Sequence, residues 1–263
     1  MSRIDDRFKS LNGNKALVAF FTAGDPDLSS SKDIFSVIEK GGADIIEIGV
    51  PFSDPLADGP VIQASAHRSL QNGTSLKKII QLVKEIRSQS QLPIVLMSSF
   101  NPIYAYGQEK FVDDAVNAGV DGVILPDLPP EEAEEFLEFA NAKNLDTIFL
   151  LAPTSTPERI QMIGEVSKGF IYYVSLTGTT GTKEALSKNL EEKVSAIKSQ
   201  VRLPVLVGFG VSGPEQAKEA AQYSDGVIIG SAIVKLIESH PDPVERDKSI
   251  AEFISGIRAA LNS

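Results

Sequence analysis

The sequence predicts an α/β protein of the (β/α)8 barrel class, also called a TIM barrel, with a short extra helix at its N-terminus. Three observations carry this prediction: eight short apolar runs, amphipathic segments between them, and a spacing of about 30 residues, the length of one strand–helix unit. The runs are nearly continuously apolar rather than alternating, which is typical of parallel strands covered on both faces. We expect strands at Leu17–Phe21, Asp44–Gly49, Ile94–Ser98, Gly122–Leu125, Thr147–Leu151, Phe170–Ser175, Val205–Phe209 and Gly226–Gly230.

The segments between these runs are expected to be helices, because their apolar residues recur every three or four positions. Pro93 and Pro204 stand just before two of the expected strands, where proline ends the preceding helix. A helix at Ile4–Leu11 is expected to close the bottom of the barrel. No linker or low-complexity segment divides the chain, so residues 1–263 are expected to form one domain. The other helices with clear periodicity are Ser29–Lys40, Leu76–Arg87, Glu131–Ala140 and Pro243–Leu261.

Composition excludes several classes of protein. The chain has 35 acidic and 25 basic residues, and its net charge of −10 argues against nucleic-acid binding through broad basic patches. It has no cysteine, which excludes disulfides, thiolate nucleophiles and iron–sulfur clusters. No apolar run approaches the roughly 20 residues of a membrane helix, and the first residues lack the apolar core of a secretory signal. We therefore expect a cytoplasmic protein, with an organelle location after removal of a transit peptide left open.

Carboxylates after the second strand are the first candidates for chemistry. Glu47 lies inside an otherwise apolar strand, where a charge is costly unless it is paired or reaches the barrel mouth. Asp58 follows in a loop with three prolines, which restrict its conformations. Active sites of such barrels lie at the C-terminal strand ends, so we expect the two carboxylates to converge there for proton transfer. Two simpler interpretations stay open: Glu47 paired with a polar neighbour, and Asp58 in an ordinary Asp–Gly turn.

Glycines after the last three strands predict a phosphate site. Glycine lets backbone N–H groups approach a ligand closely, and the helix that follows the eighth strand adds partial positive charge at its start. No strand end carries a lysine for Schiff-base chemistry, the two histidines do not cluster, and no dinucleotide fingerprint follows the first strand. We expect no metal, although a magnesium site of Asp54, Asp58 and Asp127 is an untested alternative. The expected phosphate contacts are Gly181, Gly210, Gly230 and Ser231.

The run Glu47–Pro60 resembles the signature of the tryptophan synthase alpha subunit family. The resemblance covers nearly the whole chain, with further motifs at Phe20–Pro26, Leu176–Gly181, Gly208–Gly210 and Gly230–Val234. It implies a lyase of tryptophan biosynthesis that cleaves indole-3-glycerol phosphate to indole and glyceraldehyde 3-phosphate in a retro-aldol reaction. It implies no cofactor in this chain.

The resemblance assigns the catalytic roles to Glu47, Asp58 and Tyr172. Glu47 would protonate C3 of the indole ring and help remove the proton of the glycerol hydroxyl. Asp58 would stabilise or take the indole N–H proton, and Tyr172, in the sixth strand, would support the site.

The resemblance also assigns substrate contacts. Phe20, Leu96 and Phe209 would enclose the indole ring, since an aromatic ligand needs an apolar wall. Thr180 would meet Asp58 when the loop after the sixth strand closes as a lid. The phosphate would be held by the Ser231 hydroxyl and by backbone N–H groups of Gly181, Gly210, Gly230 and Ser231.

The resemblance implies one protein partner, a beta subunit that carries pyridoxal phosphate and receives indole through a tunnel. The two subunits would form a heterotetramer with two copies of each, which would bury Asp54 and the region of Asn101. Two alternatives remain: a free-standing lyase that releases indole, and a catalytically idle protein that only activates a beta subunit. The presence of both carboxylates disfavours the idle protein. We expect no nucleic acid or membrane as a partner.

Overall fold

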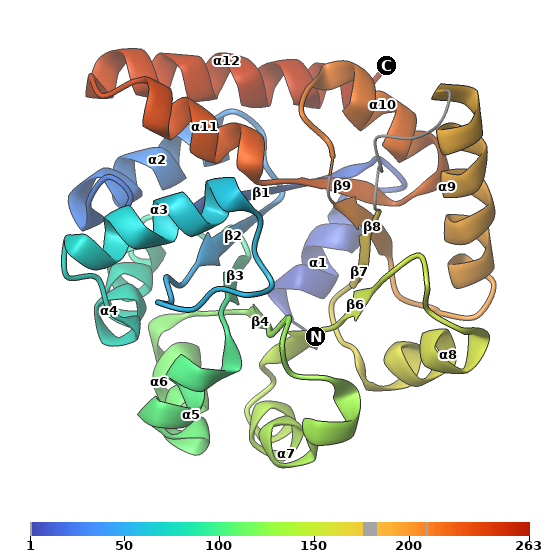
Figure 1. Cartoon of the computed structure of the whole chain (residues 1–263), viewed down its shortest axis with the longest axis horizontal. Coiled ribbons are helices and arrows are strands. Elements are labelled where there is room, and N and C mark those ends of the chain that lie inside the picture. Colours follow the sequence, from blue (N-terminus) through green and yellow to red (C-terminus); the bar gives the residue numbers. More distant parts are fainter. Residues whose placement is uncertain (1, 176–182, 209) are drawn as a thin grey trace.

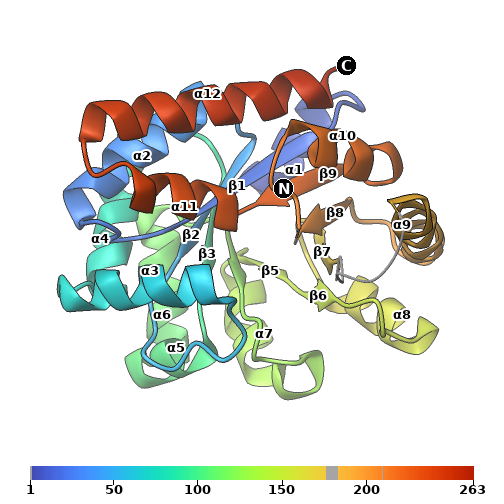
Figure 2. The same cartoon turned by 45° about the horizontal axis from the view of Figure 1, so that its top comes forward.

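The strands form one parallel sheet that curves round the centre of the molecule, with helices outside it (Figures 1 and 2). The computed structural model describes residues 2–175, 183–208 and 210–263. Within these residues the strand order is β5-β4-β3-β2-β1-β9-β8-β7-β6, so strands from the two ends of the chain, β1 and β9, pair with each other. The barrel prediction is confirmed. The strands are β1 (Ala16–Thr22), β2 (Ile45–Gly49), β3 (Ile94–Met97), β4 (Gly122–Ile124), β5 (Asp146–Ile148), β6 (Leu150–Leu151), β7 (Ile171–Val174), β8 (Val205–Gly208) and β9 (Gly226–Ile229).

The fifth expected strand, Thr147–Leu151, is divided in two. Its first half, β5, pairs with β4, and its second half, β6, pairs with β7. Phe149 lies between the halves, buried on the helix side of the sheet, and its carbonyl accepts a hydrogen bond from Tyr172 N at 3.2 Å. The segment changes partner at Phe149, so one continuous apolar run in the sequence becomes two short strands at the two ends of the sheet.

Helices follow the strands and cover the outside of the sheet. The bounds expected for α4 (Leu76–Arg87) and α12 (Pro243–Leu261) agree with the structure. The helix expected at Glu131–Ala140 is instead a 3-10 turn, Pro130–Glu132, followed by α7 (Glu134–Ala142). The break falls at Ala133, whose φ of −92° and ψ of 0° are not those of an α-helix. The helices are α1 (Arg3–Ser10), α2 (Leu28–Lys40), α3 (Pro60–Gln71), α4 (Leu76–Arg87), α5 (Phe100–Tyr106), α6 (Gln108–Ala118), α7 (Glu134–Ala142), α8 (Pro157–Val166), α9 (Lys183–Lys198), α10 (Pro214–Tyr223), α11 (Ser231–Ser239) and α12 (Pro243–Leu261).

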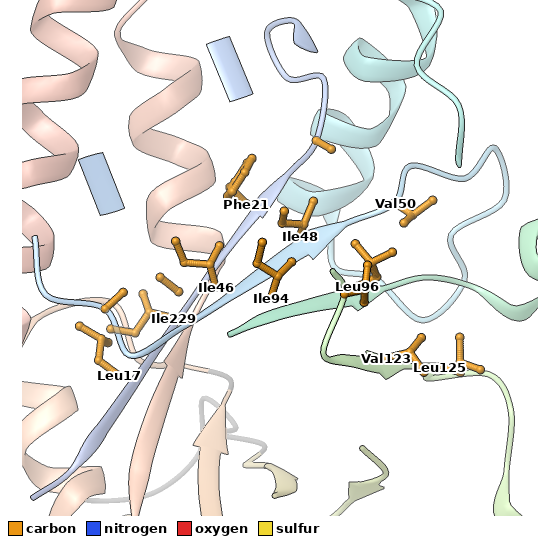
Figure 3. Packing of buried hydrophobic residues seen from close by; sticks show 14 of the residues in the cluster. Leu17, Phe21, Ile46, Ile48, Val50, Ile94, Leu96, Val123, Leu125 and Ile229 are labelled. Atoms are coloured by element: carbon orange, nitrogen blue, oxygen red, sulfur yellow. The ribbon is translucent and has the colours of Figure 1, made fainter. Parts of the chain in front are cut away.

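The buried apolar side chains form two layers. The larger layer fills the space between strands and helices, and Figure 3 shows part of it around Ile48, Ile94 and Leu96. The smaller layer fills the inside of the barrel and includes Ile4 of α1. Because Ile4 is fully buried beneath the strands, the N-terminal helix closes the bottom of the barrel as expected.

Three aspartates at this bottom end each accept a hydrogen bond from the backbone of a neighbouring strand. Asp44 accepts from Leu17 N at 2.7 Å, and Asp121 accepts from Ile94 N at 2.8 Å. Asp225 accepts from Val205 N at 2.8 Å. Arginines from α1, α4 and α12 pair with two of these carboxylates, so the bottom of the barrel is closed by structural contacts and the opposite end is left for ligands.

Candidate active site

A cavity of about 910 Å³ opens at the C-terminal ends of the strands. Both of the predicted acid–base carboxylates line it, as do most of the predicted binding residues that the structure describes. This volume lies in the range of small-molecule sites. The lining residues used below are Phe20, Glu47, Asp58, Met97, Leu150, Tyr172, Gly210, Ile228, Gly230, Ser231 and Lys235.

Glu47 is the third residue of β2, and its side chain is directed into the cavity. Its neighbours Ile46 and Ile48 pack on the helix side of the sheet (Figure 3), as the alternation of side chains along a strand requires. The residue is 1% exposed, and its Oε2 has no hydrogen-bond partner among the described residues. Burial, and then the negative charge of Asp58, raise the pKa of Glu47 to about 8. The interpretation of Glu47 as an ordinary paired carboxylate is therefore not supported.

Asp58 is half-buried at the mouth of the same cavity. The loop that carries it is held by its own hydrogen bonds: Asp58 N donates to Pro55 O at 3.1 Å, and Gln63 Nε2 donates to Asp58 O at 2.8 Å. Burial, and then the nearby charge of Asp127, raise the pKa of Asp58 to about 6. At pH 7 the two carboxylates thus differ, because Glu47 is mainly protonated and Asp58 mainly ionised. That difference is what separates an acid from a base in one site.

Glycines make room for the two aromatic residues of the cavity. A Cβ on Gly208 would lie 2.6 Å from the Tyr172 hydroxyl, and a Cβ on Gly49 would lie 2.6 Å from Cζ of Phe20. Both glycines therefore allow close packing that alanine would block. Burial, followed by the charges of Glu47 and Asp58, raises the pKa of Tyr172 well above its ordinary value, so its hydroxyl stays protonated.

The predicted phosphate end combines a turn and a helix start. Gly210 adopts a φ of 82°, in the left-handed region, and lines the cavity. Gly230 is the N-cap of α11, and no side chain of the described residues caps this helix start. Gly230, Ser231 and the following residue line the cavity, so the first N–H groups of α11 are available to an anion there. Thr180, Gly181 and Phe209 lie outside the described residues.

Leu96 is not brought into the cavity. It is fully buried between β3 and the helices, as Figure 3 shows, and its strand neighbour Met97 lines the cavity instead. The structure therefore brings Met97, and not Leu96, to the cavity in which the ring contact is expected. Other cavity residues absent from the sequence prediction include Pro126, Leu150, Val174, Ile228, Lys235 and Phe253.

Asp54 and Asn101, the predicted partner contacts, are both exposed. Two large apolar side chains near them are also exposed: Leu56 at 86% and Tyr104 at 66%. Among the described residues there is no group of three metal-binding side chains, so Asp54, Asp58 and Asp127 do not come together as such a group. No described helix is long and apolar enough to span a membrane.

The fold and the cavity together define an acid–base enzyme of the phosphate-binding (β/α)8 barrel class. The sequence model of the family described as "Tryptophan synthase alpha chain" matches residues 8–260. The chain belongs to the tryptophan synthase alpha chain family, whose members are lyases of tryptophan biosynthesis that cleave indole-3-glycerol phosphate.

Individual relatives are similar to this chain over nearly its full length. A tryptophan synthase alpha chain of Geobacter sp. (strain M21) is 50% identical over 263 residues, 99% of this chain and 98% of the relative. The crystal structure of tryptophan synthase subunit alpha from Legionella pneumophila has a TM-score of 0.92 at 36% identity and covers 100% of this chain and 99% of its own. A chain of the tryptophan synthase complex from Pyrococcus furiosus has a TM-score of 0.85 at 37% identity. The match covers 94% of this chain and 98% of that one.

Proposed function

We propose that Glu47 and Asp58 are the proton-transfer pair for the retro-aldol cleavage of indole-3-glycerol phosphate in this cavity. The observation that carries the assignment is their unequal pKa within one cavity, about 8 for Glu47 and about 6 for Asp58. One group is ready to give a proton at neutral pH and the other is ready to accept one.

The reaction needs no net gain or loss of protons by the enzyme. Glu47 gives its proton to C3 of the indole ring, which leaves a positive charge on the ring nitrogen, and the Asp58 carboxylate stabilises or takes the N–H proton. The Glu47 carboxylate then removes the proton of the glycerol hydroxyl, the C–C bond breaks, and its electrons return to the ring. Indole and the aldehyde form, the ring nitrogen keeps or regains its proton, and Glu47 is protonated again.

The remaining cavity residues bind the two ends of the substrate. We assign the indole ring to the wall formed by Phe20, Met97, Leu150 and Ile228, with Tyr172 beside the carboxylates. We assign the phosphate to Gly210 and to the start of α11 at Gly230 and Ser231. For Thr180, Gly181 and Phe209, the roles given by the resemblance are kept as proposals.

We further propose that residues 1–263 act as one domain within a heterotetramer with a beta subunit, and that pyridoxal phosphate belongs to that partner. The exposed apolar side chains of Leu56 and Tyr104, two and three residues after Asp54 and Asn101, support this docking face, because large exposed apolar side chains are suited to an interaction site. The loop of Leu56 and the segment before α5 also line one small crevice together. Turnover measured with and without the beta subunit tests this proposal. High activity that the beta subunit leaves unchanged would favour a free-standing lyase.

A crystal soaked with indole-3-propanol phosphate, which resembles the substrate but lacks the reacting hydroxyl, tests the site assignment. We expect the phosphate at the start of α11 and the ring between Phe20 and Met97, with its N–H facing Asp58. A phosphate bound elsewhere, or a ring remote from both carboxylates, would contradict the assignment.

A further inference from the structure

One cation lines the cavity among the residues that the structure describes, and it is Lys235. It lies on α11, four residues after Ser231, so the two side chains share one face of the helix. Its side chain is exposed, and none of the described residues forms a hydrogen bond or ion pair with it. The nearby Glu238 of α11 is engaged by Arg68, at 2.8 Å.

The charges around this lysine are otherwise unfavourable for an anion. The chain carries a net charge of −10, and Asp58, mainly ionised at pH 7, lines the same cavity. Asp58 therefore repels a phosphate monoester that binds at Gly230 and Ser231 in the same cavity. Because charges are screened within about 8 Å at physiological salt, a cation that helps the backbone N–H groups to offset this repulsion has to lie close to the phosphate.

We propose that Lys235 is a specificity residue that selects substrates with a phosphate group over their uncharged counterparts. Lys235 lies one helical turn after Ser231 and lines the same cavity, and its long side chain can extend toward a phosphate held by the first N–H groups of α11. This inference rests on the proposed function, and it adds a side-chain cation to a phosphate site that otherwise consists of backbone groups and one hydroxyl.

The test compares two ligands by calorimetry: indole-3-propanol phosphate and indole-3-propanol, which lacks the phosphate. We expect Lys235→Gln to raise the Kd of the phosphorylated ligand about three- to tenfold, the scale of one partly exposed ionic contact. Lys235→Glu should raise it further, and Lys235→Arg should restore most of the affinity. Binding of indole-3-propanol should not change. The effect should shrink between about 0.05 M and about 0.5 M salt.

Lys248→Gln is the matched control, because Lys248 is an exposed lysine of α12 outside the lining of the cavity and the substitution changes the net charge equally. Unchanged Kd values in Lys235→Gln would overturn the inference. It would also be overturned if Lys235→Gln raised the Kd of both ligands equally, or if Lys248→Gln raised the Kd of the phosphorylated ligand as much as Lys235→Gln does. A loss confined to kcat would place Lys235 against Asp58 instead and would also overturn it. Failure of the proposed function looks different: the unmodified protein would neither bind the phosphorylated ligand nor cleave indole-3-glycerol phosphate.

Discussion

Replacing Glu47 with glutamine should make the protein more stable while it removes activity, and the gain in stability should grow with pH. The pKa of Glu47 rises from an ordinary value of 4.5 to about 8 in the folded protein. Between these two values the unfolded chain releases a proton that the folded protein retains. Stability therefore falls as pH rises through this window, whereas below about pH 4.5 the carboxyl group carries no such penalty.

The size of this pH effect on stability follows from the pKa shift of Glu47. Each pH unit within the window costs the folded state about 1.4 kcal/mol. From pH 5.5 to pH 7.5 the free energy of unfolding of the native protein should fall by at most about 3 kcal/mol because of Glu47. The glutamine variant should not show this decrease. The side chain is 1% exposed, so solvent screening reduces the value little.

The assay is urea unfolding followed by circular dichroism at both pH values, for the native protein and for Glu47→Gln. We expect the stability difference between the two proteins to increase by about 2–3 kcal/mol from pH 5.5 to pH 7.5. Glu192→Gln, at an exposed position on α9, is the control and should give the same difference at both pH values. A pH-independent difference for Glu47→Gln would refute the argument that the buried carboxyl group is held protonated.

Four further predictions concern activity. Glu47→Gln and Asp58→Asn should each lower kcat about 10²–10⁴-fold, with the Kd of indole-3-propanol phosphate nearly unchanged, and near-normal turnover would exclude the role assigned to the residue. In the native protein kcat/KM should rise with pH through about 6, as Asp58 ionises, and fall beyond about 8, as Glu47 loses its proton; a profile flat from pH 5 to pH 9 would contradict both assignments. Ser231→Asp should raise KM by placing a negative charge beside the phosphate, and an unchanged KM would move the phosphate site elsewhere. Met97→Ala should raise KM, whereas Leu96→Ala should lower the free energy of unfolding by about 2–5 kcal/mol with little effect on KM; the opposite result would restore Leu96 to the ring contact.

Most strands and several helices could be predicted because their signals are local. The apolar periodicity of Leu76–Arg87 and of Pro243–Leu261 gives the observed bounds of α4 and α12. The division at Phe149 could not be predicted, because it depends on which strands lie beside that segment. No residue within the run indicates the change of neighbour.

The same limit applies to the position of Leu96. In a strand that is apolar on both faces, the sequence does not indicate which residues face the cavity and which face the helices. The structure resolves this, since Val95 and Met97 contact the inner layer and Leu96 the outer one. The raised pKa of Asp58 is likewise a tertiary effect, because Asp127 is 69 positions further along the chain.

The three aspartates at the bottom of the barrel show that part of the chain's acidic composition has a structural role. Asp44, Asp121 and Asp225 each bind the N–H of one defined residue on an adjacent strand. If two strands slid past each other by one residue, a carboxylate would lose its hydrogen bond to the backbone, and every apolar side chain of the moved strand would turn to the wrong face. The hydrogen bonds of these carboxylates therefore favour one register between neighbouring strands. They hold the register that places Glu47 on the cavity side of β2 rather than among the helices.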